Sequence, residues 1–300
     1  MSAFIRRDIT IVLDDITLDG WLYRPDVSSG PVPVVVMSGG YATVKEMFTD
    51  RFAEVFATAG LAVVLYDHRN FGKSGGAPRG EIDPWRQVRD MQDVITWASL
   101  QEGVDPGRIG LWGSSYSGGH ALLLGAMDRR LSAVAVQIPT VSGFLSAQRR
   151  IAPHLAAQVR AAHAADRRAR LQGAAPERRP VIPQDGVPGI YNGPDAAAFY
   201  ESGARNAPHW DNSITLRSTE LSAHYDPAAA IDRISPTPLL MIVAQEDDVT
   251  PTDLALSAYQ RALEPKQLMI TPGGHFDVYG RHFAQTSQAA RDWFALHLGA

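Results

Sequence analysis

The residues most able to do chemistry lie in the run Gly113-Ser114-Ser115-Tyr116-Ser117, which follows an apolar stretch and leads into a helical pattern. A nucleophilic serine on a sharp strand-to-helix turn needs small residues two positions before and two positions after it. With Ser115 at the apex, those positions hold Gly113 and Ser117. The spacing therefore predicts Ser115 as the nucleophile, with Ser117 as a small substitute for the usual glycine.

Two alternatives for this run stay open. If Ser117 were the nucleophile, Ser115 would stand where a glycine is wanted, and the strand would end two residues too early. A serine-rich helix N-cap without catalytic chemistry would also give such a run.

A serine hydroxyl needs an imidazole to accept its proton as it attacks a carbonyl. Of nine histidines we favour His275, because its glycine-flanked loop follows the last apolar run and precedes the final helical pattern. His68, at the end of a predicted strand, is the alternative base, whereas His120 is expected to pack against the sheet. Four more histidines fall in or near the insertion described below: His154, His163, His209 and His224.

The third group should be a carboxylate at the end of an earlier strand, where it orients the imidazole and stabilises its protonated form. The apolar run 239–244 is followed by three adjacent acids, Glu246, Asp247 and Asp248. We predict Asp247, which stands four residues before Pro251 at the start of the next helical pattern. Asp248, and after it Glu246, are the alternatives.

An oxyanion hole supplies backbone N–H donors to the negative oxygen that forms during acyl transfer. One donor should be the amide of Tyr116, the residue after the nucleophile. The other is predicted to be the amide of Tyr41, because Ser38-Gly39-Gly40-Tyr41 follows the first parallel strand and its glycines permit close approach. The Tyr41 phenol is a further candidate donor, and a simple strand-ending turn is the alternative for this loop.

The elements that must position these groups alternate between strands and helices. Period-2 patterns over 8–13 and 16–23 predict an antiparallel hairpin at a sheet edge. Continuous apolar runs predict parallel strands covered on both faces at 32–37, 61–66, 108–112, 131–137, 239–244 and 267–270. Helical patterns lie between most of them, at 44–58, 88–100, 118–127, 252–263 and 287–297. We therefore expect an α/β fold with a doubly wound, mostly parallel sheet and a site at the carboxyl ends of its strands.

The alternation breaks between residues 141 and 221. The predicted organisation is a core domain of residues 1–140 and 222–300 with a cap insertion of residues 141–221, helical over 144–171 and loop-like over 173–194. Residues 146–180 hold eight arginines against two acidic residues, a local net charge of +6. These arginines form either a solvated surface or a lid that favours anionic substrates.

Composition excludes several classes of protein. Charged residues make up 20% of the chain and the net charge is −4, so no global field indicates nucleic acid or a membrane surface. Cysteine is absent, which excludes disulfides, thiolate metal sites and cysteine nucleophiles. The first 15 residues lack the pattern of a signal peptide, and no apolar stretch reaches the roughly 18 residues of a membrane span. We expect a cytoplasmic enzyme with no metal and no cofactor, acting on a small-molecule acyl substrate, and we allow for a homodimer.

These motifs resemble the α/β-hydrolase superfamily over nearly the whole chain outside the insertion. The resemblance is closest to the branch of dienelactone-hydrolase-like proteins, CocE-type acyl esterases and X-Pro dipeptidyl peptidases, and fungal polyketide transferases are similar too. It is carried by three segments: 66–75 (YDHRNFGKSG), 113–119 (GSSYSGG) and 273–277 (GGHFD). Ser38-Gly39 departs from the more usual His-Gly of the oxyanion loop.

The resemblance implies an α/β-hydrolase fold with a helical cap, and the chain order serine, aspartate, histidine agrees with it. It maps Ser115, Asp247 and His275 onto the family triad and Tyr41 and Tyr116 onto the oxyanion hole. The expected function is hydrolysis of an ester, lactone or thioester. The alternatives are an acyltransferase or a cyclising or release enzyme, and a non-catalytic binding protein on the same scaffold. Residues 67–76 are expected to shape a loop beside the pocket.

Overall fold

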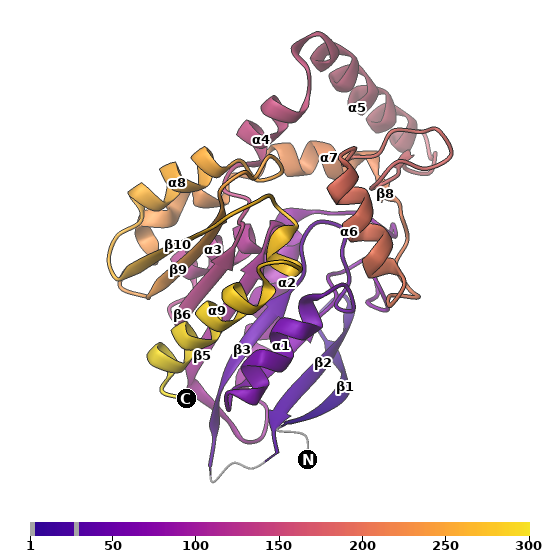
Figure 1. Cartoon of the computed structure of the whole chain (residues 1–300). Coiled ribbons are helices and arrows are strands. Elements are labelled where there is room, and N and C mark those ends of the chain that lie inside the picture. Colours follow the sequence, from indigo (N-terminus) through magenta and orange to yellow (C-terminus); the bar gives the residue numbers. More distant parts are fainter. Residues whose placement is uncertain (1–3, 27–29) are drawn as a thin grey trace.

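The computed structural model describes residues 4–26 and 30–300. A sheet of eight strands runs through the molecule in the order β1-β2-β4-β3-β5-β6-β9-β10 (Figure 1). The strands are β1 (Phe4–Val12), β2 (Thr17–Pro25), β3 (Val32–Ser38), β4 (Ala62–Tyr66), β5 (Val104–Ser114), β6 (Leu131–Gln137), β9 (Leu239–Ala244) and β10 (Lys266–Thr271).

The sheet combines an antiparallel edge with a parallel body. β1 pairs with β2, Val12 opposite Thr17, and β2 pairs antiparallel with β4, whereas every pair from β4 to β10 is parallel. The predicted hairpin and its place at the sheet edge are confirmed, although β1 begins four residues earlier than expected. All residues of β4 and β9 are buried, as expected of parallel strands covered on both faces.

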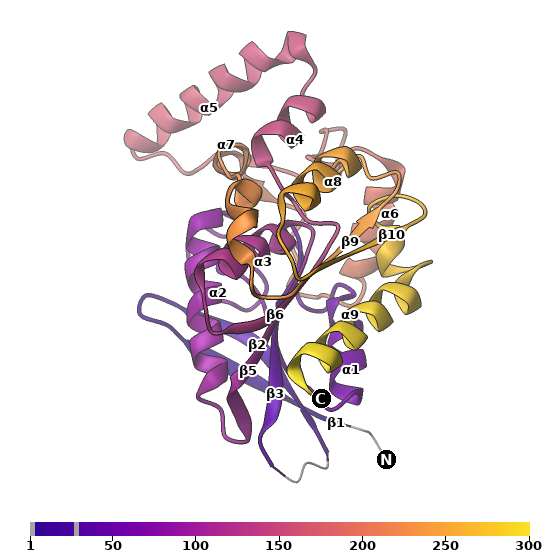
Figure 2. The ribbon, with the colours of Figure 1, turned by 90° about the vertical axis from the view of Figure 1, so that its left-hand side faces the viewer.

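Helices cover both faces of the sheet (Figure 2). α1 (Thr49–Thr58) and α9 (Phe283–Leu298) contact each other on one face. On the other face lie α2 (Pro84–Ser99) and α3 (Tyr116–Met127), and the short helix η2 (Pro227–Ile234) contacts both α3 and α8 (Thr252–Arg261). The doubly wound arrangement predicted from the sequence is confirmed.

Three helix starts differ from the predictions by four residues or more, and one of them is α9, which begins at Phe283 instead of residue 287. The first helix was expected from residue 44 but begins at Thr49, because Phe48 has a left-handed φ of 69° that an α-helix excludes. The turns before it are held by bonds such as that from the Lys45 amide to Asp67 Oδ1, 2.6 Å. α2 begins four residues before its apolar pattern, because the side chain of Asp83 caps the amides of Trp85 and Arg86.

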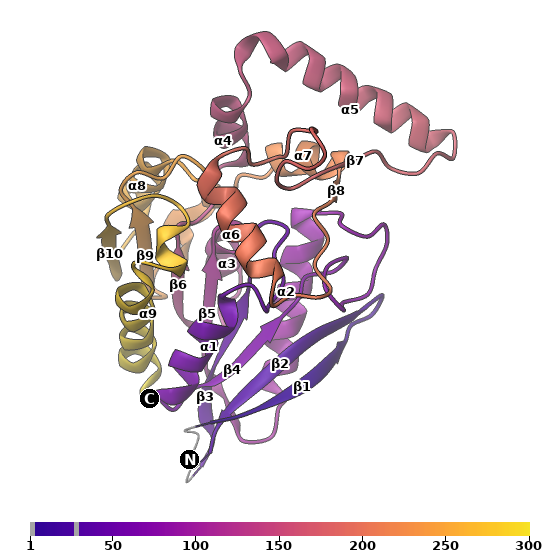
Figure 3. The same cartoon turned by 45° about the vertical axis from the view of Figure 1, so that its right-hand side comes forward.

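A layer of helices lies over one end of the sheet (Figure 3). It contains α4 (Gly143–Arg150), η1 (Pro153–Leu155), α5 (Ala156–Leu171), α6 (Pro194–Ala204) and α7 (Leu216–Ala223), with the two-residue strands β7 (Arg178–Arg179) and β8 (Ile214–Thr215). The predicted helix 144–171 is thus divided, and Pro153 stands in the break, where a proline cannot continue an α-helix. In the described residues no helix has both the length and the apolar character needed to cross a membrane.

Candidate active site

Ser115 stands alone between the end of β5 and the start of α3. Its φ of 55° and ψ of −114° form a strained turn of the kind that lifts a side chain out of the sheet. A Cβ at Gly113 would lie 2.1 Å from the carbonyl oxygen of Ser117, so glycine is required there. The turn is fixed because the Ser115 amide donates to Gln137 O (2.9 Å) and its carbonyl accepts from the Thr140 amide (2.8 Å).

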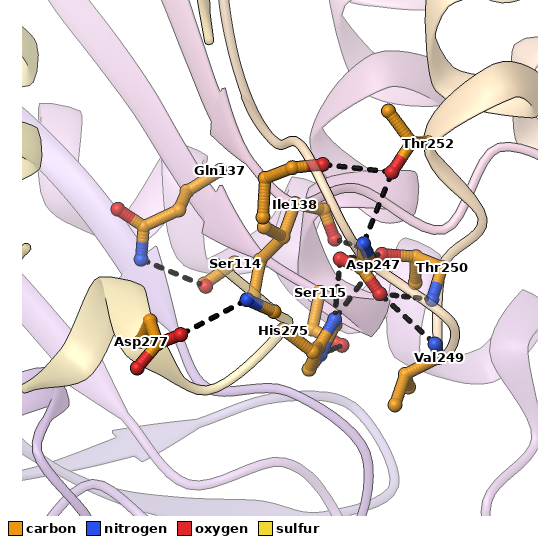
Figure 4. Close-up of polar contacts among 12 residues, drawn as sticks. Ser114, Ser115, Gln137, Ile138, Asp247, Val249, Thr250, Thr252, His275 and Asp277 are labelled. Atoms are coloured by element: carbon orange, nitrogen blue, oxygen red, sulfur yellow. Dashed lines mark hydrogen bonds and ion pairs between the residues drawn. The ribbon is translucent and has the colours of Figure 1, made fainter. Parts of the chain in front are cut away.

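The structure brings the three predicted polar groups into one hydrogen-bonded chain (Figure 4). His275 Nε2 lies 2.9 Å from Ser115 Oγ, and His275 Nδ1 lies 2.8 Å from Asp247 Oδ2. An ionised carboxylate only accepts, so the proton of the neutral imidazole resides on Nδ1. His275 Nε2 is then free to accept the proton of the Ser115 hydroxyl, which is the arrangement that nucleophilic catalysis requires.

Burial and hydrogen bonding separate the three neighbouring acids. Asp247 is buried, whereas Glu246 and Asp248 are exposed. Asp247 Oδ1 accepts from the amides of Val249 (2.9 Å) and Thr250 (2.8 Å), which holds the carboxylate in its orientation toward His275. Of the three acids, only Asp247 is placed to orient the imidazole.

Thr250 is part of this site and was not singled out in the sequence. Its hydroxyl lies 2.9 Å from Asp247 Oδ2, 3.2 Å from His275 Nδ1 and 3.0 Å from the carbonyl oxygen of Ile138. The spacing of three residues from Asp247 to Thr250 is the only signal the sequence offered, and threonine at such a spacing is common in turns.

The loop that carries His275 is closed by a second carboxylate. Gly273 has a left-handed φ of 81°, and a Cβ there would lie 2.1 Å from Asp277 Oδ2. That same oxygen accepts from the Gly274 amide at 2.9 Å (Figure 4). The paired glycines therefore let the loop turn tightly enough to place the imidazole over Ser115.

The two predicted oxyanion donors flank Ser115. Gly40 approaches Ser115 so closely that a Cβ on it would lie 3.1 Å from Ser115 Cβ and 3.5 Å from its Oγ. The Gly40–Tyr41 peptide therefore borders the reacting hydroxyl, as the Tyr116 amide does by its place in the chain. Neither amide makes a hydrogen bond to another described residue, so both are available to a ligand.

Two aromatic side chains far along the chain, one on α6 and one in the loop after it, hold the oxyanion loop by hydrogen bonds. The Tyr200 hydroxyl of α6 donates to the carbonyl of Tyr41 (2.7 Å), and Trp210 Nε1 donates to the carbonyl of Ala42 (2.7 Å). Burial raises the pKa of the Tyr41 phenol, so the phenol stays protonated at neutral pH. The Tyr41 and Tyr116 rings meet edge to face with centroids 5.0 Å apart.

The alternative base His68 contacts a different serine. His68 Nε2 lies 2.8 Å from Ser117 Oγ, and the Ser117 hydroxyl donates to the carbonyl of Gly39. Burial lowers the pKa of His68 to about 3, so it is neutral at pH 7. His120 bonds Tyr225 and Gln87 inside the protein, in agreement with the packing role expected for it.

A cavity of about 550 Å³ opens beside Ser115, between the sheet and the helical layer. Most of its wall is apolar, with Ile151, Leu155 and Val159 among the lining residues, and its basic residues are Arg150, His163 and Arg179. No aspartate or glutamate lines it in the described part of the chain. Of the aromatic residues in the segment 141–221, Tyr191 lines the cavity, whereas Phe199, Tyr200 and Trp210 pack onto the core and Phe144 is exposed.

Most of the arginines in residues 146–180 form ion pairs or are exposed to solvent. Five form ion pairs with acidic residues: Arg149 with Asp253, Arg167 with Glu220, Arg170 with Asp166, Arg178 with Asp211 and Arg179 with Glu177. Arg160 and Arg168 are exposed and do not line the cavity. A solvated surface therefore describes most of this arginine-rich segment. Within residues 4–26 and 30–300, no group of three or more histidines and acids is placed to hold a metal ion.

Comparison with known proteins assigns the family. The model of the family described as X-Pro dipeptidyl-peptidase (S15 family) matches residues 14–277. The thiohydrolase aneE of Aspergillus aculeatus is 33% identical over 265 residues, which cover 86% of this chain and 82% of that protein. The polyketide transferase grgF of a Penicillium species is 32% identical over 283 residues, which cover 93% of this chain and 92% of that protein.

The fold agrees with that assignment. The crystal structure of the α/β hydrolase GrgF from Penicillium sp. sh18 matches 99% of this chain and 100% of that chain at 29% identity, with a TM-score of 0.83. This confirms the α/β-hydrolase fold that the motifs implied. The chain therefore belongs to the X-Pro dipeptidyl-peptidase (S15) family and is an α/β-hydrolase enzyme.

Proposed function

We propose that this enzyme hydrolyses a thioester or ester, lactones included, through an acyl-enzyme intermediate on Ser115. The observation that supports this most strongly is the chain of hydrogen bonds from Ser115 Oγ through His275 to Asp247, which ends at the floor of a largely apolar cavity. A carbonyl compound seated in that cavity meets a nucleophile, a base and two free amides at once.

The proposed reaction has two halves. As Ser115 Oγ bonds to the carbonyl carbon, its proton passes to His275 Nε2, and Asp247 stabilises the imidazolium. The carbonyl oxygen becomes negative and accepts from the amides of Tyr41 and Tyr116. The carbon–sulfur or carbon–oxygen bond then breaks, and the leaving thiol or alcohol takes the proton from His275. Water attacks the acyl-serine by the same route and releases the acid.

The chemistry of the cavity favours an acyl substrate over a peptide. The family description names a dipeptidyl peptidase, and a dipeptide released from a chain carries a cationic terminal amine. A buried ammonium group needs an anionic partner, and no carboxylate lines the cavity in the described residues. The relatives named thiohydrolase add support for a thioester.

Acyl transfer to a hydroxyl or amine is the second proposal, because one relative is named a polyketide transferase and another an acyltransferase. The same acyl-enzyme serves both reactions, and only the acceptor differs. The ratio of transfer product to free acid, measured over a panel of alcohols and amines, separates them. Release of free acid alone across the whole panel would count against transfer.

A labelling experiment tests the proposal directly. A fluorophosphonate should modify Ser115, identified by mass spectrometry, and an acyl thioester of N-acetylcysteamine should be cleaved with release of thiol. Ser115→Ala should abolish both, whereas Ser114→Ala, a change at the adjacent serine, should retain labelling. If the folded wild-type protein is neither labelled nor active on thioesters and esters, a binding protein on this scaffold is the better interpretation. Release of X-Pro dipeptides at a rate above ester cleavage would instead support a peptidase.

A further inference from the structure

Arg150 differs from every other arginine of residues 146–180. It lines the cavity beside Ser115, and no ion pair joins it to an acidic residue among the described residues. Both Arg150 and its neighbour on α4, Arg149, are exposed, but Arg149 forms two hydrogen bonds to the carboxylate of Asp253, 2.5 and 2.6 Å long. Adjacent residues of α4 are therefore a neutralised cation, Arg149, and an uncompensated cation at the cavity, Arg150.

The contacts of Arg150 orient its guanidinium without neutralising it. The guanidinium carbon lies 5.0 Å from the centre of the Tyr191 ring, and Nη2 donates to the carbonyl of Val249 at 3.2 Å. Stacking on an aromatic ring and one bond to a carbonyl leave most of the five N–H donors of a guanidinium free. No other hydrogen bond of this side chain joins it to a described residue.

These contacts also place Arg150 near the reacting groups. Val249 is two residues after Asp247 and donates its amide to that carboxylate. The Tyr191 ring meets the Tyr41 ring edge to face with centroids 6.0 Å apart. Only the Tyr191 ring thus stands between Arg150 and the Tyr41 ring of the oxyanion loop. Only Val249 stands between Arg150 and the carboxylate of Asp247.

The ionisable side chains that line the cavity are all basic, apart from its tyrosines. Arg150, Arg179 and His163 are its ionisable basic residues, and no acid of the described residues lines it. Arg179 is compensated by Glu177 at 2.6 Å, so Arg150 supplies the unbalanced charge. A cleft of one sign with apolar walls concentrates ligands of the opposite charge.

From this we infer that the substrate is an acyl compound with an anionic group, a carboxylate or a phosphate, which Arg150 binds while the carbonyl is held at Ser115. This inference rests on the proposed acyl-hydrolase function and adds the charge of its substrate. The anion belongs either to the acyl chain or to the leaving group, and a guanidinium would bind it in the same way in both cases.

Matched substrates test the inference. One arm uses 4-nitrophenyl monoesters of dicarboxylic acids with four to ten carbons, each compared with the ω-carboxamide of equal length. The other arm keeps a neutral acyl chain and compares the thioester of 3-mercaptopropionate with that of its amide. In one of the two arms, wild-type kcat/KM should favour the anionic member about 10- to 100-fold, the range expected of a charge-assisted hydrogen bond.

Matched variants assign that preference to Arg150. Arg150→Gln should lower kcat/KM for the anionic member far more than for the neutral member and so remove most of the preference, Arg150→Lys should restore part of it, and Arg149→Gln should leave it intact. Arg179→Gln should reduce it less than Arg150→Gln does. In the wild type, the preference should also decline with added salt.

The result that overturns the inference differs from the one that overturns the proposed function. Equal kcat/KM for anionic and neutral members in both arms, with Ser115 still labelled and neutral esters still cleaved, rejects the anionic substrate only. A preference that survives Arg150→Gln, or that falls equally in Arg149→Gln, rejects the role of Arg150. Absence of labelling and of all turnover rejects the proposed function itself.

Discussion

Two serines that lie two residues apart, Ser115 and Ser117, each contact a histidine. The two serine–histidine pairs differ in what the other ring nitrogen, Nδ1, contacts. In the pair Ser115–His275, Nδ1 donates to Asp247, so Nε2 faces the serine as an acceptor. In the pair Ser117–His68, the serine donates to the carbonyl of Gly39, so Nε2 of His68 must be the donor. The Nδ1 atom of His68 is buried and has no partner among the described residues.

The difference shows what a carboxylate does for a serine–histidine pair. Asp247 fixes the tautomer that can accept a proton from serine and compensates the charge that results. Without an acid, burial lowers the pKa of His68 to about 3, and the pair serves as a neutral tether between the turn and the oxyanion loop. We therefore expect that proximity of serine to imidazole without a carboxylate is not sufficient for catalysis.

The largest expected effect comes from removing the nucleophile. Ser115→Ala should lower kcat on an activated ester by about 10⁴- to 10⁶-fold, because no other group of the site can form the acyl-enzyme. Steady-state hydrolysis and fluorophosphonate labelling measure it. If Ser117→Ala abolished labelling instead, in a protein with native circular dichroism, the assignment of the two pairs would be reversed.

Removing the carboxylate of Asp247 should make the pair Ser115–His275 resemble the pair Ser117–His68. Asp247→Asn offers Nδ1 an amide in place of a carboxylate, which permits the tautomer with the proton on Nε2 and leaves the imidazolium uncompensated. We expect kcat to fall about 10³- to 10⁴-fold with little change in KM. Asp248→Asn, a change in the exposed neighbour, is the matched control. A similar loss in both variants would mean that Asp247 has no special role.

Breaking the tether should have a smaller effect on turnover and a visible effect on stability. Ser117→Ala removes the bond to Gly39 and leaves His68 Nε2 unpaired in a buried site, which should lower the free energy of unfolding by about 1–3 kcal/mol. Turnover should fall no more than about 10-fold, below the loss of about 10²–10³ for a whole oxyanion donor. Urea unfolding and kcat measure the two effects. Unchanged stability would show that the tether is not a stabilising contact.

The last expected effect concerns stability in acid rather than turnover, and it is specific to His68. Its pKa is about 3 in the folded chain against 6.5 ordinarily, so between these values the unfolded chain binds more protons. Its contribution to stability is fully present at pH 7 and is lost as the pH falls from 6.5 toward 3. The difference in unfolding free energy between the wild type and His68→Asn should therefore shrink over this range. A difference that stays constant with pH would contradict the lowered pKa.

Much of the site could be predicted because its signals are local. The run Gly113–Ser117 encodes a turn through the sizes of its own residues, and the parallel strands encode their burial through continuous apolar sequence. Periodicity failed at the first helix, where a left-handed Phe48 and the bond from Lys45 to Asp67 override the helical pattern. Such bonds join residues far apart in sequence and leave no periodic trace.

The sequence by itself predicted Ser115 as the nucleophile and determined the sheet and the family, because steric limits on a tight turn and burial on a strand act between near neighbours. Only the tertiary structure distinguished Asp247 from its two acidic neighbours, joined Ser117 to His68, and added Thr250 to the site. It also separated Arg150 from the other arginines of its segment. These choices depend on which side chain faces inward across distant loops, and a single sequence carries no signal for that orientation.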